Sequence, residues 1–446
     1  MALRHTLATL LILGPLLQAP AGAQHVVDCR EWHECRQLAL AAYASGDYER
    51  FHDLAWRTVQ TGPARNADLM YLLARAQSLS GRPHDALVML TRLAEMGVTT
   101  DAMVNDEFRV VRTLPGWPAA EALILGAAQP PPAAGRDVTS SPAAAPGPAA
   151  YEARASVRPL LTPVDALRVP SATLNPTGLS YDRVSGRFVV ADRHARALSI
   201  IDERSRHLVD LVSAESAGFY DITALEIDVR RGDLWVVSAV APESNGKLTT
   251  VLHMLQLVSG RPLIALPLPE PFGPARFDDV AVSDRGTVFM LDGLGGRVFR
   301  LGTDKRSFVV AGALRVDHLT SFAPADDRIA YVAYAGGIAR LDLSTGAALP
   351  LPGPKDAELS GFERIRWDRD SLVGIQRLPD GTRRVVRVRL ARTGRRALAV
   401  DVVAPDVSMT DPMAATLVDH VFYFVTRESH GGDQEPEIVV HRVPLP

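Results

Sequence analysis

The sequence predicts a multidomain protein with an N-terminal all-α part, a Pro- and Ala-rich linker, and a C-terminal all-β part built from a repeated unit. Three observations predict this organisation. Apolar residues recur at helical spacing up to residue 126, short β-type runs recur from residue 157 onward, and prolines crowd the stretch between them. At 446 residues the chain is also too long for one ordinary core, which favours two or more domains.

The composition is that of a globular protein without a general attraction to polyanions. Hydrophobic residues make up 47% of the chain and charged residues 22%. The net charge is −3 at pH 7 and the isoelectric point is near 6.5. These values argue against general binding to nucleic acid or to anionic lipid, so we expect no nucleic-acid partner.

The first 23 residues have the features of a secretory signal. Arg4 and His5 give a positive start, Leu7 to Leu17 is an apolar stretch, and Ala21-Gly22-Ala23 matches the small-residue cleavage pattern. The alternative is a buried N-terminal helix. The apolar stretch is too short to span a bilayer, and no second long apolar run follows. We therefore expect a chain exported to the periplasm or secreted, with no membrane span after cleavage.

The only two cysteines, Cys29 and Cys35, lie close to the predicted mature N-terminus. A lone pair in an oxidising compartment is typical of a disulfide. On one continuous helix the two residues would lie about 9 Å apart along the axis, which is too far for a bridge. A Cys29–Cys35 disulfide therefore requires Cys29 to lie outside the helix, folded back against its first turn. The alternative, a metal site that recruits His25 or His33, lacks a recognised spacing.

Residues 24–126 are predicted to form α-helical repeats. From residue 36 onward, apolar stripes at helical spacing are interrupted at Gly46-Asp47, Gly62-Pro63 and Gly81-Arg82-Pro83. Gly46 and Gly81 then form the inter-helix turns of two units about 35 residues apart. We expect the segment from Asp101 to Leu125 to supply a half-repeat cap.

This period and several of its residues resemble the tetratricopeptide repeat. Leu38-Ala39 and Leu73-Ala74 stand where that family has a leucine followed by a small residue, and Ala86 fills the small position of a second helix. Phe51 and Pro83 depart from the pattern, because the family has a small and an aromatic residue at these places. The resemblance implies a rigid helical surface for partners.

Residues 127–156 are predicted to be an extended linker, since Pro130-Pro131-Pro132 and similar stretches cannot bury a core. Between residues 157 and 446, six β runs of one kind recur at steps of about 40 to 56 residues, which is the length of one β-propeller blade. The sequence therefore predicts a six-bladed β-propeller, with Ala166 to Pro170 as an outer strand that closes the ring. The six runs are Phe188–Asp192, Leu234–Val237, Val288–Asp292, Ile329–Val332, Ser371–Gly374 and Val421–Phe424.

Two of these units resemble a known kind of blade. Pro176 to Asp202 and Phe277 to Asp292 are similar to the blades of NHL-repeat propellers and of the senescence-marker-protein (gluconolactonase) family. These propellers include enzymes, adhesive modules and scaffolds. The resemblance implies, for the lactonases, a metal held by a Glu, an Asn and an Asp, with another Asp as base. This chain has Thr177 where the Glu-bearing motif is expected, and it has no Asn-Gly-Leu motif.

Polar residues just before each innermost strand are expected to line one mouth of the propeller channel. Asp279, His318 and Glu363 come from three consecutive units, and two carboxylates with an imidazole can hold a divalent cation, calcium or zinc. The alternative is that these groups cap strand ends and bond loop amides. The candidate ligand site comprises Asp221, Asp278, Asp279, His318 and Glu363, within a ring that also includes Asn175, Thr177, Thr223, Asp317, Asp411 and Met413.

Other chemistry-bearing motifs are absent or have structural explanations. The sequence contains no Gly-x-Ser-x-Gly elbow, no Walker loop and no Rossmann glycine fingerprint. The arginine-rich stretch from Arg383 to Arg396 is interpreted as the solvated face of an edge strand rather than as a surface for an acidic partner. Glu428 to Glu437 is interpreted as a long loop inside the last blade.

Two hypotheses for function follow. In the first, the protein is an exported, non-enzymatic binding or scaffold protein whose helical repeats and propeller act at a distance across the linker. It would recognise protein partners or a small-molecule ligand. In the second, it is a metal-dependent lactonase or esterase-like hydrolase at the propeller mouth. We favour the first from the sequence, because helical repeats rarely serve catalysis and the metal ligands that the lactonase resemblance implies are incomplete.

Overall fold

A computed structural model describes residues 29–63, 65–127, 164–171, 173–202, 208–214, 216–240, 248–316, 318–355, 357–405, 414–428 and 435–445. The predicted signal peptide lies outside these residues, as does all of the predicted linker except residue 127 and part of the predicted loop between Glu428 and Glu437. No helix among the described residues combines the length and the apolar character needed to cross a membrane.

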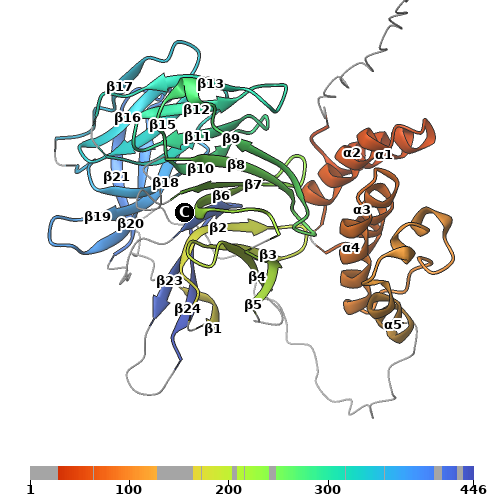
Figure 1. The fold of residues 1–446 in the computed structure, drawn as a ribbon. Coiled ribbons are helices and arrows are strands. Elements are labelled where there is room, and N and C mark those ends of the chain that lie inside the picture. The colour runs from red at the N-terminus through yellow and green to blue at the C-terminus, as the bar shows by residue number, and fades with distance from the viewer. Residues whose placement is uncertain are drawn as a thin grey trace, which may run out of the picture.

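The N-terminal part folds as five α-helices within the described residues (Figure 1). The predicted turns at Gly46 and Gly81 are confirmed, and both glycines have positive φ, 75° and 79°. Asp47 and Asn66 cap the helices that follow them by accepting backbone N–H bonds. That these helices are tetratricopeptide repeats stays a prediction. The helices are α1 (Trp32–Ala44), α2 (Tyr48–Thr61), α3 (Ala67–Leu79), α4 (Pro83–Glu95) and α5 (Trp117–Ala127), with short 3-10 turns at Asp106–Phe108 and Val111–Thr113.

The predicted disulfide is present at the start of this part. Cys29 precedes α1 and Cys35 lies in its first turn, and their Cα atoms are 5.3 Å apart. Because Cys29 lies outside the helix, the bridge avoids the separation along the axis that a continuous helix would impose. Both side chains are buried.

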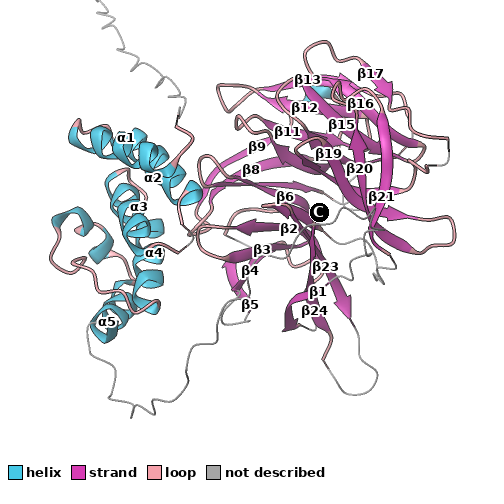
Figure 2. Cartoon of the chain, turned by 180° about the vertical axis from the view of Figure 1, so that it is seen from behind, coloured by secondary structure: helices cyan, strands magenta, loops and turns pink. Residues whose placement is uncertain are grey.

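The C-terminal part is a six-bladed β-propeller: the described residues form six four-stranded sheets around a common axis (Figures 1 and 2). Neighbouring blades meet through their first strands, which are therefore innermost. These are β2 (Pro176–Asp182), β6 (Asp221–Asp228), β10 (Phe277–Val282), β14 (Leu319–Pro324), β18 (Phe362–Asp368) and β22 (Ala415–Val418). The second strands are β3 (Arg187–Asp192), β7 (Asp233–Ala239), β11 (Val288–Asp292), β15 (Ile329–Tyr334), β19 (Ser371–Arg377) and β23 (Val421–Glu428). The outer strands are β4 (Ala197–Asp202), β5 (Leu208–Val212), β8 (Thr250–Gln256), β9 (Pro262–Pro267), β12 (Arg297–Leu301), β13 (Phe308–Ala313), β16 (Gly337–Asp342), β17 (Ala348–Pro350), β20 (Arg383–Leu390), β21 (Ala397–Ala404) and β24 (Glu437–Pro444).

The ring is closed by β1 (Val164–Pro170), the first strand of the propeller in sequence. It pairs antiparallel with β24, so that Arg168 lies opposite Val439, and it becomes the outermost strand of the last blade. The predicted closing strand is therefore confirmed. Closure in this way ties the two ends of the propeller into one sheet, which leaves no open gap between the first and last blades.

The helical part packs directly against the first two blades, contrary to the expectation that the two parts act at a distance. One hydrophobic core includes Trp56, Met89 and Leu90 from the helices and Ile227 and Val258 from the propeller. The physical reason is that the apolar face of the helices exceeds what the helices alone can cover, and burying it against another layer is favourable.

Polar contacts fix the same interface. The Trp56 indole N–H donates to the carbonyl oxygen of Val229 at 2.8 Å, and Arg92 donates to the carbonyl oxygen of Ser185 at 2.7 Å. The backbone N–H of Ser259 donates to the buried Asp85 carboxylate at 3.1 Å. All three propeller residues lie in turns at the end of the ring where innermost strands terminate, so the helices cover that side of blades one and two.

Candidate functional site at the propeller axis

The mouth of the channel, the end where the innermost strands begin, is shaped by β-bulges. Five of the six innermost strands leave one residue unpaired near their start. Where that residue is threonine, its hydroxyl donates to a backbone carbonyl of the next innermost strand, as in Thr320 to Phe362 at 2.7 Å. These bonds staple neighbouring blades together. The five bulge residues are Thr177, Thr223, Asp278, Thr320 and Glu363.

The predicted mouth carboxylates each have an arginine partner. Asp221 accepts from Arg196 at 3.1 Å, and Asp278 accepts from Arg276 at 2.7 Å. Glu363 accepts from Arg383 at 2.8 Å. These groups lie at the mouth as predicted, but each is held in an ion pair with an arginine and is not a free ligand.

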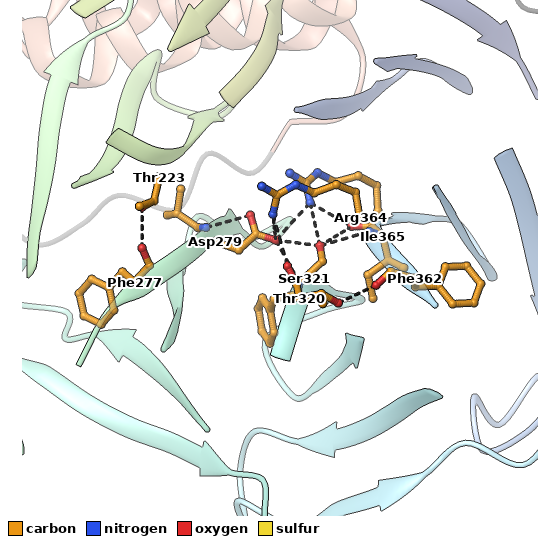
Figure 3. A network of polar contacts seen from close by, with 11 residues as sticks. Thr223, Phe277, Asp279, Thr320, Ser321, Phe362, Arg364 and Ile365 are labelled. Carbon is orange, nitrogen blue, oxygen red and sulfur yellow. Dashed lines mark hydrogen bonds and ion pairs between the residues drawn. The ribbon is translucent and has the colours of Figure 1, made fainter. Parts of the chain in front are cut away.

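Asp279 lies deeper and is 1% exposed (Figure 3). One of its oxygens accepts from the Ser321 hydroxyl at 2.8 Å and from the backbone N–H of Phe322 at 3.1 Å, and the other accepts from the N–H of Val280 at 3.1 Å. Asp279 therefore joins β10 to β14 in the way that the threonines join other blades.

The predicted metal site at Asp279, His318 and Glu363 is not formed. Asp279 is buried among its hydrogen bonds, Glu363 is paired with Arg383, and His318 is exposed with a positive φ of 54°. Within the described ranges, no three His, Cys, Asp or Glu side chains are grouped so that they could hold a metal ion. The bulges explain the difference, because they turn successive residues of the innermost strands toward different neighbours. Asp317, Asp411 and Met413 lie outside the described residues.

A cavity of about 180 Å³ lies at the far end of the channel, where the innermost strands terminate. Its lining includes Val282 and Pro324, the last residues of β10 and β14, together with Trp367 near the end of β18. Three ionisable side chains also line it: Glu226 of β6, Asp284 in the turn after β10, and Arg366 of β18. The cavity is thus at the opposite end from the predicted mouth.

Glu226 is a carboxyl group suited to proton transfer near neutral pH. Burial and the negative charge of Asp279 together raise its pKa to about 7, against the opposing effects of Arg366 and the Ile227 N–H. No side chain of the described chain forms a hydrogen bond with it. A carboxyl group with such a pKa exchanges protons readily at neutral pH, as a general acid or base must.

Two arginines share the Asp279 carboxylate, and one of them, Arg366, lies close to Glu226. Arg366 and Arg364 approach the same oxygen of Asp279, at 3.5 Å and 4.0 Å. Arg366 also donates to the carbonyl oxygen of Ile365 at 3.0 Å, yet its Nε atom is buried without a partner among the described residues. Burial lowers the pKa of Arg364. Two guanidinium groups facing one carboxylate leave positive charge available for a bound anion or a developing oxyanion.

A serine–histidine contact elsewhere in the propeller does not form a second site. The Ser238 hydroxyl lies 2.9 Å from His253 Nε2, but the two residues are only 0% and 3% exposed. Burial lowers the pKa of His253 to about 4. A substrate cannot reach this pair, and we interpret it as a hydrogen bond within the blade core.

The sequence predictions missed Glu226, Arg364 and Arg366, although a signal for them exists. They belong to the repeat copies Ala224–Asp228 and Arg364–Asp368, which align with innermost strands of mainly apolar or small residues. Charged residues inside such strands are costly to bury unless they have a partner or a purpose. A charged residue at an interior position of a predicted innermost strand is therefore the sequence signal for this cluster.

Comparison with known proteins gives the fold and no family. No protein-family model matches the chain, and no curated protein sequence matches it. Among solved structures, a glucose dehydrogenase is 14% identical with a TM-score of 0.45, over 64% of this chain and 100% of that one. A gluconolactonase from Xanthomonas campestris is 15% identical with a TM-score of 0.42, over 65% and 99%. The PQQ-bound aldose sugar dehydrogenase from Streptomyces coelicolor is 13% identical with a TM-score of 0.44, over 63% and 98%.

These findings correct the favoured interpretation of the sequence. The three similar propellers are enzymes, so none of them supports the non-enzymatic scaffold that we favoured from the sequence. The scaffold hypothesis also assumed that the helices and the propeller act at a distance. In the structure the helices pack directly on the propeller. The likeness itself, at these identities, shows only the propeller fold, so any activity has to be argued from the residues of this chain.

Proposed function

We propose that the propeller is a hydrolase of lactones or esters that works in the axial cavity with Glu226 and Arg366. The observation that carries this proposal is the presence in one cavity of a carboxyl group whose pKa is about 7 and of a guanidinium whose buried Nε–H has no partner among the described residues. Ester hydrolysis needs these two functions, a base for the attacking water and a donor for the carbonyl oxygen.

In the proposed reaction, ionised Glu226 takes a proton from a water molecule as that water attacks the carbonyl carbon. Arg366 stabilises the negative charge that develops on the carbonyl oxygen. The acyl C–O bond then breaks, and Glu226 returns its proton to the leaving alkoxide. The products are an alcohol and a carboxylic acid, which loses its proton to solvent and leaves as a carboxylate.

The burial of the site supports the proposal. The cavity is small, and Phe322 and Trp367 line it together with the charged groups. A site with apolar walls strengthens the interaction between a guanidinium and a developing oxyanion, because less water screens it. Small lactones and short-chain esters are therefore the substrates that we expect.

The test is hydrolysis of a panel of small lactones and short-chain esters by the purified protein and its Glu226→Gln variant. We expect kcat/KM of the wild-type protein to rise with pH through about 7, because only the ionised form of Glu226 accepts a proton. Glu226→Asp should restore part of the rate, and Glu31→Gln, at an exposed position before α1, should leave it unchanged. Absence of hydrolysis, or equal rates for Glu226→Gln and wild type, would refute the proposal.

Metal dependence forms a separate arm of this test. The proposed chemistry uses only side chains of the cavity, so chelation with EDTA should leave the rate unchanged. A rate that falls on chelation and returns with calcium or zinc would instead favour the metal-dependent lactonase hypothesis.

Export and the repeat identity of the helices are part of the same proposal. The Cys29–Cys35 disulfide supports an oxidising compartment, the periplasm or the exterior, in line with the predicted signal peptide. The helical turns at Gly46 and Gly81 support tetratricopeptide-like units, whose exposed face is where a protein partner would bind. Fractionation of cells that express the full chain, with detection of the processed N-terminus, tests the export.

A further inference from the structure

A second, larger cavity lies outside the axial site, between blades two and three. It measures about 440 Å³ and is bordered by the turns that follow β6, β10 and β12. Six charged side chains line it, four of them basic. They are Asp228, Arg231, Arg285, Arg300, Asp304 and Lys305.

The two acidic groups of this cavity are engaged with their own turns. Asp228 accepts the backbone N–H of Arg230 at 3.0 Å, and Asp304 accepts the backbone N–H of Ser307 at 2.9 Å. Burial raises the pKa of Asp228 to about 6, so this carboxyl group contributes less than a full negative charge near that pH. Two acidic groups against four basic ones leave the lining with a surplus of positive charge.

Three of the basic side chains have no ion-pair or hydrogen-bond partner among the described residues. Arg231, Arg285 and Arg300 form no ion pair and no side-chain hydrogen bond with any described residue. Lys305, by contrast, lies 3.8 Å from the Asp233 carboxylate. Arg231 and Arg285, in the turns after β6 and β10, and Arg300 of β12 thus face one concave space, and none of them forms an ion pair with a described residue.

An unpartnered buried donor adds an independent observation. Trp235 also lines the cavity and is 1% exposed, and its indole N–H has no hydrogen-bond partner in the described part of the chain. A buried N–H without a partner is costly, and native proteins usually satisfy such groups. A ligand oxygen is one group that would satisfy it.

We propose that this cavity binds the phosphate group of a small organic phosphate. Guanidinium groups bind phosphate oxygens by paired N–H bonds, and a phosphate group offers oxygens to several of them at once. The volume falls within the range of small-molecule sites and exceeds what a phosphate ion alone needs. A phosphorylated sugar or a molecule of similar size fits both the charge and the space.

Calorimetric titration of the full chain tests this, with glucose 6-phosphate, inorganic phosphate and glucose as probes. Glucose 6-phosphate should bind more tightly than inorganic phosphate, and glucose should not bind. Arg285→Gln and Arg300→Gln should each weaken binding about tenfold. Arg395→Gln removes an exposed arginine at the β20–β21 turn and should have no effect. Trp235→Phe, which keeps the ring and removes the N–H, should weaken binding less than the arginine variants do.

Three outcomes would overturn the proposal. One is the absence of binding at millimolar glucose 6-phosphate. Another is equal weakening by Arg395→Gln, which would indicate diffuse attraction to a basic surface and not a site. A third is equal affinity for inorganic phosphate, which would exclude recognition of the organic part. Circular dichroism and the unfolding temperature of each variant show whether it is folded.

Discussion

The carboxylates at the two ends of the propeller channel differ in whether they have a hydrogen-bonded arginine partner. At the mouth, Asp221, Asp278 and Glu363 each accept hydrogen bonds from a neighbouring arginine. At the far end, Glu226 lines a cavity with no side-chain hydrogen-bond partner, and its pKa is about 7. The position of a carboxyl group on the propeller is thus a weaker guide to function than its ion pairing and its pKa. A carboxylate that is already ion-paired with an arginine is not available to a substrate.

Asp279 lies between the two ends and belongs to neither. It is buried, hydrogen-bonded to β14, and shared by Arg364 and Arg366, and its charge helps to hold the guanidinium of Arg366 near the cavity. Its negative charge also helps to raise the pKa of Glu226. We therefore describe Asp279 as a positioning residue.

The largest effect expected from this comparison is on catalysis. Glu226→Gln should lower kcat/KM for a lactone or ester by about 10² to 10⁴, the usual contribution of a general base. Glu363→Gln changes the same chemical group at the mouth and should leave kcat/KM unchanged, because Glu363 is paired with Arg383. Steady-state kinetics of both variants check this. A greater loss in Glu363→Gln than in Glu226→Gln would move the site back to the mouth.

The next effect concerns stability. Asp279→Ala should lower the free energy of unfolding by about 3–5 kcal/mol, because it leaves two buried guanidinium groups without their shared partner. Asp221→Ala should cost less than about 1 kcal/mol, because its partner Arg196 is exposed. Denaturant unfolding measures both values. Equal losses of unfolding free energy would show that the contacts of Asp279 contribute no more to stability than the exposed ion pair of Asp221.

A smaller effect is expected at the interface between the helices and the propeller. Trp56→Phe removes the hydrogen bond to Val229 and should cost about 1 kcal/mol, with the single unfolding transition kept. Tyr48→Phe, at an exposed tyrosine of α2, is the control and should change nothing. Calorimetry distinguishes the outcomes. Two separate transitions in the wild-type protein would contradict a shared core.

The last effect is a pH dependence of stability. The pKa of Glu226 is raised from 4.5 to about 7 in the folded chain, so between these values the folded state binds more protons than the unfolded state. Stability due to this group is therefore full below pH 4.5 and declines as the pH rises toward 7. The Glu226→Gln variant lacks this titrating group. Its unfolding temperature should therefore rise relative to that of the wild-type protein as the pH increases across this interval. A constant difference between the two would argue against the raised pKa.

Much of the fold could be predicted because it follows from patterns among residues that are close in the sequence. Repeated β runs with Gly and Asp turns gave the number of blades, the β run from Ala166 to Pro170 indicated the closing strand, and the six-residue spacing of Cys29 and Cys35 required the bridge to form outside the helix. Each of these depends on residues that lie close in sequence or on a repeat that is visible in it.

The site and the docking of the helices could not be predicted in the same way. The bulges at Asp278 and Glu363 shift the register by one residue, and one residue decides which neighbour a side chain meets. The apolar stripe of α2 looks the same whether it faces another helix or the propeller. Such features depend on contacts between distant segments, which a single sequence does not display.

The measurement that tests the central claim most directly is the titration of Glu226 itself. Carboxyl carbon NMR of the protein labelled at glutamate, assigned by comparison with Glu226→Gln, follows its protonation as the pH is changed. The account predicts a midpoint near pH 7, above the ordinary value of 4.5. A midpoint near 4.5 would contradict it, since Glu226 would then be an ordinary ionised carboxylate and the far end of the channel would hold no group poised for proton transfer.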